Sequence, residues 1–227
     1  MEFQSILEHA VRDERIGACL GAPDAERHAY PWEHLERSMA RRGETRLAIA
    51  SFGALMCSDE GARLLNDPGT FTNGRPVVVF GAKRVFAYEI PDHRFELYGE
   101  PPTDDQRAAL SAFATGKSTD FFNAVLLTVD LGRLGYLRDR ESGYDLCPAV
   151  YKAWDSMGDP PRSCFVFSAQ GGLDSAVARD DLRPFMPYVD ACRRACRSVS
   201  EPFERLFLET SFLSDRRTPL SEYLHNA

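Results

Sequence analysis

The 227-residue sequence lacks the features that mark several large classes of protein. No apolar run approaches the roughly 20 residues that a membrane-spanning helix needs, so we expect no contact with the membrane interior. Residues 1–15 carry charges throughout and lack the apolar core of a signal peptide. These absences predict a cytoplasmic protein.

Basic residues are too few and too scattered for a nucleic-acid-binding face. Lys and Arg number 27 against 34 Asp and Glu, which gives a net charge of −7. A protein that binds duplex nucleic acid needs a basic face to displace the counterions of the phosphates. One dense basic cluster occurs at residues 192–197. The charge balance therefore predicts no nucleic-acid partner.

Motifs for common cofactors and catalytic centres are also missing. The sequence has no G-x-G-x-x-G, P-loop, H-E-x-x-H, G-x-S-x-G or C-x-x-C pattern. Its six cysteines and five histidines do not group at the spacing of a zinc site. Cysteines of a cytoplasmic chain stay reduced, and small buried side chains are their expected role. We expect neither a metal ion nor an organic cofactor.

Residues 1–43 read as two amphipathic helices. Residues spaced by three and four predict the first helix, with Gly17 at its end. Pro31 is typical of a first helical position, and Gly43 of a helix end, which predicts the second helix. We expect these helices to be an N-terminal extension of a domain that comprises residues 44–227. The first apolar stripe consists of Phe3, Ile6, Leu7, Ala10 and Val11.

The middle of the chain is rich in strand-forming segments. Expected strands cover residues 47–50 (continuing to 55), 76–80, 84–90, 121–129, 144–154 and 163–167. Residues 100–120 are expected to form a loop with a short helix at 106–113. Helical periodicity returns at residues 185–199, 202–207 and 218–224. Central strands with helices at both ends predict an α+β domain with a curled sheet or small barrel.

A glycine directly follows the first expected strand, in Ser51-Phe52-Gly53-Ala54-Leu55. Glycine lets the backbone turn sharply and brings N–H groups to a cavity surface, where they can hold an anion such as a carboxylate. A glycine in this place can equally do no more than end the strand. The residues alone leave both interpretations open.

A second segment, residues 136–144, places Glu141 between a short expected helix and the next strand. A carboxylate at such a junction can point into the mouth of a barrel and act as a general acid and base. The alternative is a surface ion pair with Arg138 or Arg140. Asp139 lies two residues away and should point elsewhere.

Together these segments resemble motifs of the γ-glutamyl cyclotransferase family. Phe52-Gly53-Ala54-Leu55 is similar to the family's Tyr-Gly-Ser-Leu turn, and residues 136–144 to its Tyr-Leu-x-x-Arg-Glu-x-Gly-Tyr segment. Residues 80–86 resemble its Gly-x-x-Arg-x-Phe stretch, and residues 123–126 its Asn-Gly-Val-Leu strand. Residues 207–224 resemble its closing helices, so the resemblance extends over about residues 46–224.

The resemblance implies a small mixed β-barrel flanked by helices, with a cavity at one end. It implies that Glu141 is the catalytic acid and base, which takes a proton from the substrate α-ammonium and returns it to the leaving amine. The products would be 5-oxoproline and an amine or peptide. Glutathione is one candidate substrate, and a γ-glutamyl-protected biosynthetic intermediate is another. The substrate-binding residues that the resemblance implies are Ser51, Phe52, Gly53, Ala54, Leu55 and Tyr144.

Two positions depart from the family pattern. Phe52 and Ala54 lack the hydroxyl groups of the family's tyrosine and serine. A buried substrate group that loses its partner costs about 1–3 kcal/mol. Either the substrate differs from the usual γ-glutamyl compounds, or activity is reduced or absent. Two alternatives therefore stay open: a non-catalytic relative that binds a small acidic metabolite, and a protein-interaction module that uses residues 1–43. A homodimer is also left open.

Overall fold

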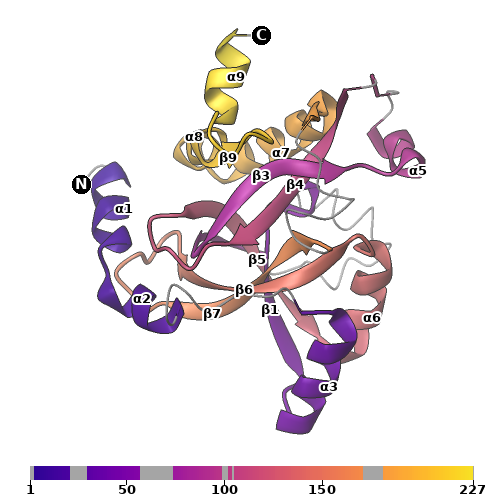
Figure 1. Ribbon diagram of the computed structural model, residues 1–227. Helices are drawn as coiled ribbons and strands as arrows, with labels where there is room; N and C mark the ends of the chain where they lie inside the picture. Colours follow the sequence, from indigo (N-terminus) through magenta and orange to yellow (C-terminus); the bar gives the residue numbers. More distant parts are fainter. Residues whose placement is uncertain are drawn as a thin grey trace.

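The computed structural model describes residues 3–20, 30–56, 74–98, 102–103, 105–170 and 181–226. Strands occupy the centre of the molecule, and helices lie at its periphery (Figure 1). Within the described residues, no helix is both long and apolar enough to cross a bilayer. The predicted α+β class is confirmed.

Five strands close a mixed barrel, as the resemblance implied. Their order around the barrel is β1-β5-β2-β6-β7, in which neighbours pair antiparallel except for the parallel pair of β7 with β1. Each of these strands coincides with a segment that the apolar runs predicted. The strands are β1 (Arg46–Ser51), β2 (Arg75–Phe80), β5 (Phe121–Asp130), β6 (Tyr144–Ala153) and β7 (Arg162–Ala169).

A second, four-stranded sheet has the order β8-β4-β3-β9. It consists of β8 (Arg183–Pro184), β4 (Gln106–Ala114), β3 (Ala82–Glu89) and β9 (Ser211–Phe212). The prediction of a short helix at 106–113 is therefore wrong, because these residues form β4. The alanine-rich segment favours a helix when isolated, but antiparallel pairing with β3 and burial of Ala108, Leu110 and Ala112 override that propensity.

The N-terminal helices are α1 (Phe3–Val11), α2 (Glu14–Leu20) and α3 (Trp32–Arg42). The prediction that the first helix ends at Gly17 is wrong. That helix ends at Val11, and a new helix starts directly after Asp13. The Asp13 carboxylate accepts the N–H of Arg15 at 3.0 Å, so it caps α2, which runs through Gly17. The end predicted at Gly43 is confirmed by its left-handed backbone, with φ of 66°.

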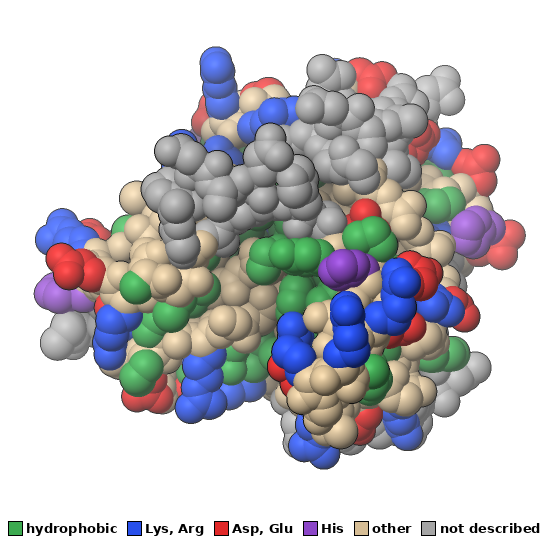
Figure 2. Space-filling model, turned by 60° about the horizontal axis from the view of Figure 1, so that its bottom comes forward, with side chains coloured by type: hydrophobic (Ala, Val, Ile, Leu, Met, Phe, Trp, Pro, Cys, Tyr) green, Lys and Arg blue, Asp and Glu red, His purple; other side chains and the backbone are tan. Residues whose placement is uncertain are grey.

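These three helices pack on the barrel. Leu7 of α1 and Ile16 of α2 lie in one apolar cluster with Phe80 of β2, and Trp32 of α3 lies in the main core. The Trp32 indole also donates to the carbonyl of Tyr144 at 2.7 Å. Figure 2 turns the underside of Figure 1 forward and shows basic and acidic side chains intermingled on this face.

The remaining helices connect and cover the sheets. They are α5 (Asp92–Phe95), α6 (Leu131–Arg140), α7 (Met186–Val199), α8 (Glu201–Thr210) and α9 (Leu220–Asn226), with the 3-10 turns η1 (Ala54–Met56) and η2 (Glu96–Tyr98). In Figure 1 α7, α8 and α9 lie above the strands, and α6, which connects β5 to β6 in the chain, lies to the right. The hydroxyl of Ser200 accepts the N–H of Phe203 at 3.2 Å and caps α8.

Candidate active site

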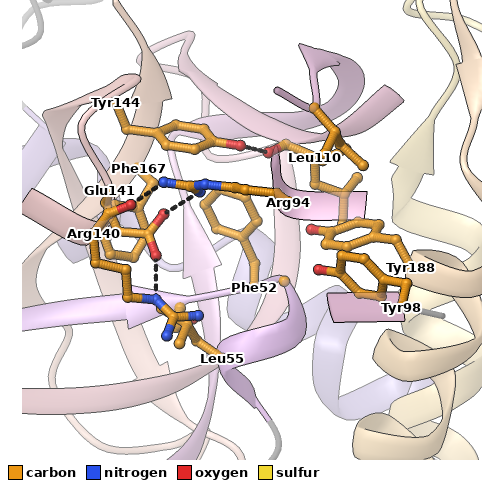
Figure 3. A pocket seen from close by; sticks show the side chains of 14 residues that line it. Phe52, Leu55, Arg94, Tyr98, Leu110, Arg140, Glu141, Tyr144, Phe167 and Tyr188 are labelled. Carbon is orange, nitrogen blue, oxygen red and sulfur yellow. Dashed lines mark hydrogen bonds and ion pairs between the residues drawn. The ribbon is translucent and has the colours of Figure 1, made fainter. Parts of the chain in front are cut away.

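A cavity of about 80 Å³ lies where the end of β1 and the start of β6 meet β4, α5 and α7 (Figure 3). Six of the seven residues predicted for the site line it: Ser51, Phe52, Gly53, Leu55, Glu141 and Tyr144. Ala54 begins η1, and its side chain lies outside the described residues. The two sequence segments are thus brought to one cavity, although Glu141 follows Gly53 by 88 positions in the chain.

Local hydrogen bonds fix both segments. After β1, the carbonyl of Gly53 accepts the N–H of Met56 at 2.9 Å, which closes the turn of η1. At the end of α6, the N–H of Glu141 donates to Leu137 at 2.9 Å, and its carbonyl accepts the N–H of Tyr144 at 2.8 Å. Glu141 therefore ends a helix and opens a tight turn into β6. This double role holds its backbone in place at the cavity wall.

Glu141 is buried, with 8% of its surface exposed, and it faces two arginines. The Arg140 Nε atom donates to Oε1 at 2.8 Å, and a terminal nitrogen of Arg94 lies 3.9 Å from Oε2. The other terminal nitrogen of Arg94 donates to the carbonyl of Arg140. The ion pair with Arg140 that the sequence left as an alternative is present, but it lies inside the cavity wall.

Two other charged residues of α6, Arg138 and Asp139, point away from the cavity. Arg138 pairs with Asp139 at 3.3 Å and lies 3.8 Å from Glu33 and Glu36 of α3. The Asp139 side chain is 75% exposed, as expected for a residue that does not face the cavity. Glu141 is therefore the carboxylate that α6 and its following turn bring to the cavity.

Two glycines let tyrosine rings approach the backbone of the site. A Cβ atom on Gly53 would overlap the hydroxyl of Tyr188 from α7. A Cβ atom on Gly143 would meet the ring of Tyr88 from β3, with carbon atoms at 2.7 and 2.8 Å. A Cβ atom at either position would force the neighbouring tyrosine to shift, so this close approach favours glycine.

Tyrosine side chains form much of the remaining wall. Tyr144 stacks on Tyr88 with ring centroids 4.3 Å apart, and its hydroxyl donates to Leu110 at 2.9 Å. Tyr98 and Tyr188 lie side by side in Figure 3, with ring centroids 6.0 Å apart. Burial raises the pKa of Tyr144 and Tyr188 well above its ordinary value. These hydroxyls therefore stay protonated, as hydrogen-bond donors, at neutral pH.

Sequence reasoning missed Arg94, Tyr98 and Tyr188. Arg94 and Tyr98 come from the connection between β3 and β4, which carries no local motif. The spacing around Tyr188 indicated only the buried face of a helix.

The described residues hold no group of three or more His, Cys, Asp or Glu side chains that could bind a metal ion. Five cysteines lie in this part of the chain, and none of them forms a disulfide bond there: Cys19, Cys147, Cys164, Cys192 and Cys196.

Neither a protein-family model nor a curated protein sequence matches the chain. Solved structures do match. YkqA from Bacillus subtilis aligns with a TM-score of 0.54 at 15% identity, over 75% of this chain and 55% of YkqA, so the chain spans little more than half of that protein. A γ-glutamyl cyclotransferase specific to glutathione from yeast aligns with a TM-score of 0.51 at 12% identity, over 79% of this chain and 99% of the yeast chain.

The chain has the γ-glutamyl cyclotransferase-like fold. This confirms the resemblance at the level of architecture, since identities of 12–15% establish a shared fold and leave the reaction to the site itself. In this cyclotransferase-like fold, the glycine turn and Glu141 meet at one cavity.

Proposed function

We propose that the protein is a cyclotransferase that releases 5-oxoproline from a γ-glutamyl peptide or amine, with Glu141 as the general acid and base. The observation that carries this proposal is the burial of the Glu141 carboxylate in the same cavity as the turn at Gly53. The shared fold with a glutathione-specific cyclotransferase supports it. Glutathione is accordingly the first substrate to test.

The proposed reaction needs one proton carrier and no external nucleophile. The substrate α-ammonium gives a proton to the Glu141 carboxylate, and the free amine attacks the γ-carbonyl carbon. A new C–N bond closes the five-membered ring, and the bond to the leaving amine breaks as Glu141 returns the proton to that amine. The ring nitrogen then gives its second proton to the released amine, which departs as an ammonium ion. Because the amine and the carbonyl belong to one molecule, tethering supplies a large effective concentration.

Donors for the γ-carbonyl oxygen and the substrate carboxylate are needed as charge develops. Backbone N–H groups of the turn from Phe52 to Leu55 do not depend on the side chains that depart from the family pattern. Tyrosine hydroxyls add to them: Tyr188 lies against Gly53, and Tyr98 lines the same cavity. These hydroxyls offset the ones that Phe52 and Ala54 lack.

A substrate screen tests the proposal. The purified protein is incubated with glutathione, several γ-glutamyl amino acids and several γ-glutamyl amines, and released 5-oxoproline is measured by mass spectrometry. We expect release from at least one compound and none with Glu141→Gln. Absence of 5-oxoproline from every compound, with correctly folded protein, would contradict the proposal.

One observation favours a second candidate, a non-catalytic protein that binds a small acidic metabolite. The Oε1 atom of Glu141 is already occupied by Arg140, and Phe52 has no hydroxyl for a ligand. A binder would show an increase in melting temperature with γ-glutamyl compounds but no turnover. The interaction module is less favoured, because α1, α2 and α3 bury their apolar residues on the barrel itself.

A further inference from the structure

Arg94 reaches the proposed active site from outside both sequence motifs. It lies on α5, and its side chain, 22% exposed, extends across the cavity towards Glu141 (Figure 3). Its contact with Glu141 is loose, at 3.9 Å, whereas Arg140 holds the same carboxylate at 2.8 Å. Its bond to the Arg140 carbonyl and this contact do not exhaust the five N–H donors of a guanidinium.

The described residues that line the cavity carry an excess of positive charge. Among the described residues, the ionisable lining of the cavity consists of Arg94, Arg140, Glu141 and tyrosines, of which Tyr144 and Tyr188 stay neutral because burial raises their pKa. Two guanidinium groups face one carboxylate, so a ligand that brings an anionic group would balance the site. Arginine is well suited to this task because its planar fork matches a carboxylate.

The chemistry of the substrate indicates which anionic group this is. In a γ-glutamyl compound one carbon bears both the α-ammonium and the α-carboxylate. If the ammonium contacts Glu141, the carboxylate must lie immediately beside it. Within the described ranges, Arg94 is the cation that approaches the Oε2 atom of Glu141. A carboxylate on the leaving group would lie several bonds farther from Glu141.

We propose that Arg94 binds the α-carboxylate of the γ-glutamyl substrate and makes the site selective for substrates that carry this group. The inference rests on the proposed function, and it adds to the glycine turn a charged residue that sequence motifs do not contain. The competing explanation is structural: Arg94 holds only the end of α6 through its bond to Arg140.

A pair of substrates separates the two explanations. A γ-glutamyl compound and the 4-aminobutanoyl compound with the same leaving group differ only in the α-carboxylate, and both can close a five-membered ring. We expect the wild-type protein to favour the γ-glutamyl compound in kcat/KM by about 10- to 100-fold, the range for a hydrogen-bonded charged pair. Arg94→Gln should lose this preference by slowing the γ-glutamyl reaction alone, and Arg94→Lys should retain part of it.

The matched control is Arg138→Gln, which removes a guanidinium from α6 whose partners are Asp139, Glu33 and Glu36 and which does not line the cavity. We expect it to leave the preference unchanged. If Arg94→Gln slows both substrates equally, Arg94 is structural and the inference is wrong, while the proposed function stands.

A binding measurement decides the inference if the wild-type protein turns over neither compound, a result that would count against the proposed function. L-Glutamine and 4-aminobutanamide are titrated into the wild-type protein and Arg94→Gln by calorimetry. Arg94 recognition predicts at least about 10-fold tighter binding of L-glutamine to the wild-type protein, and no discrimination by the variant. Equal affinities in the wild-type protein, or binding of neither ligand, would overturn the inference.

Discussion

Two buried glutamates in this protein each face two arginines, and yet their surroundings differ. Glu204 of α8 is 7% exposed and receives three hydrogen bonds: two from Arg197 at 2.7 Å, one to each oxygen, and one from Arg193 at 3.1 Å. Glu141 is 8% exposed and receives one hydrogen bond at 2.8 Å, with its second oxygen 3.9 Å from Arg94.

The difference shows what separates a structural ion pair from a candidate catalytic group. Both oxygens of Glu204 are occupied, and its partners on α7 join that helix to α8. Hydrogen bonds from Arg197 hold the pKa of Glu204 below its ordinary value. Among the described residues, Oε2 of Glu141 has no contact as close as these, and it belongs to a cavity wall. Each glutamate faces two arginines, so the two sites differ in whether the second carboxylate oxygen is hydrogen-bonded.

The largest expected effect comes from removing each carboxylate in turn. Glu141→Gln keeps the shape of the side chain but cannot accept a proton, so turnover of a γ-glutamyl substrate should fall by at least about 100-fold. Glu204→Gln, the matched control, should leave turnover nearly unchanged. Initial rates of 5-oxoproline release check both, with circular dichroism to establish that each variant is folded. Equal losses in the two variants would erase the proposed distinction.

A smaller effect is expected from Gly53→Ala, because the new Cβ overlaps the Tyr188 hydroxyl. Overpacking of this kind costs about 1–3 kcal/mol of stability, and the displaced turn should slow turnover as well. The double variant Gly53→Ala/Tyr188→Phe removes the overlapping atom and leaves the next ring carbon at 3.4 Å, so stability should recover. Denaturant unfolding measures both variants.

At Gly143 we expect the opposite result, because removing a tyrosine hydroxyl should not restore stability. A Cβ atom on Gly143 would meet ring carbons of Tyr88 at 2.7 and 2.8 Å, so loss of the hydroxyl in Tyr88→Phe should not rescue Gly143→Ala. If the Tyr→Phe substitution restored stability at both glycines, or at neither, these contacts would not be the cause of the lost stability. Either result would weaken the claim that the surroundings of Glu141 depend on close tyrosine packing.

The smallest effect is the contribution of Glu204 to stability, about 1 kcal/mol because Arg197 is 63% exposed and solvent screens the pair. The pKa of Glu204 is lower in the folded protein than in the unfolded chain, so the unfolded chain binds the proton more tightly. The difference in free energy of unfolding between the wild-type protein and Glu204→Gln should therefore be full at neutral pH. This difference should shrink as the pH falls below the ordinary pKa of a glutamate and then through the lowered pKa of Glu204 in the folded protein.

Much of the fold could be predicted because its strands have local signatures. The apolar run of β5 and the β-branched run of β2 indicate buried strands without reference to the rest of the chain. β4 could not be found in this way, since its alanines favour a helix until β3 pairs with it. The break before α2 was missed because it depends on the capping carboxylate of Asp13 rather than on Gly17.

The same reasoning applies to the site. Glu141 and the turn at Gly53 lie in contiguous motifs, so the resemblance could indicate them. Arg94 and Tyr188 reach the cavity only because the second sheet and α7 pack against the barrel. No local pattern marks either residue, and their chemistry becomes visible only when the elements are assembled.

The identity of the product tests the central claim most directly. A γ-glutamyl substrate and its N-acetylated counterpart are incubated with the wild-type protein, and the products are separated by chiral chromatography. Intramolecular attack predicts 5-oxoproline with no free glutamate, and no reaction of the N-acetylated compound, whose nitrogen cannot lose a proton to Glu141 and attack. Release of glutamate, or cleavage of the blocked substrate, would mean that water is the nucleophile and would contradict the account.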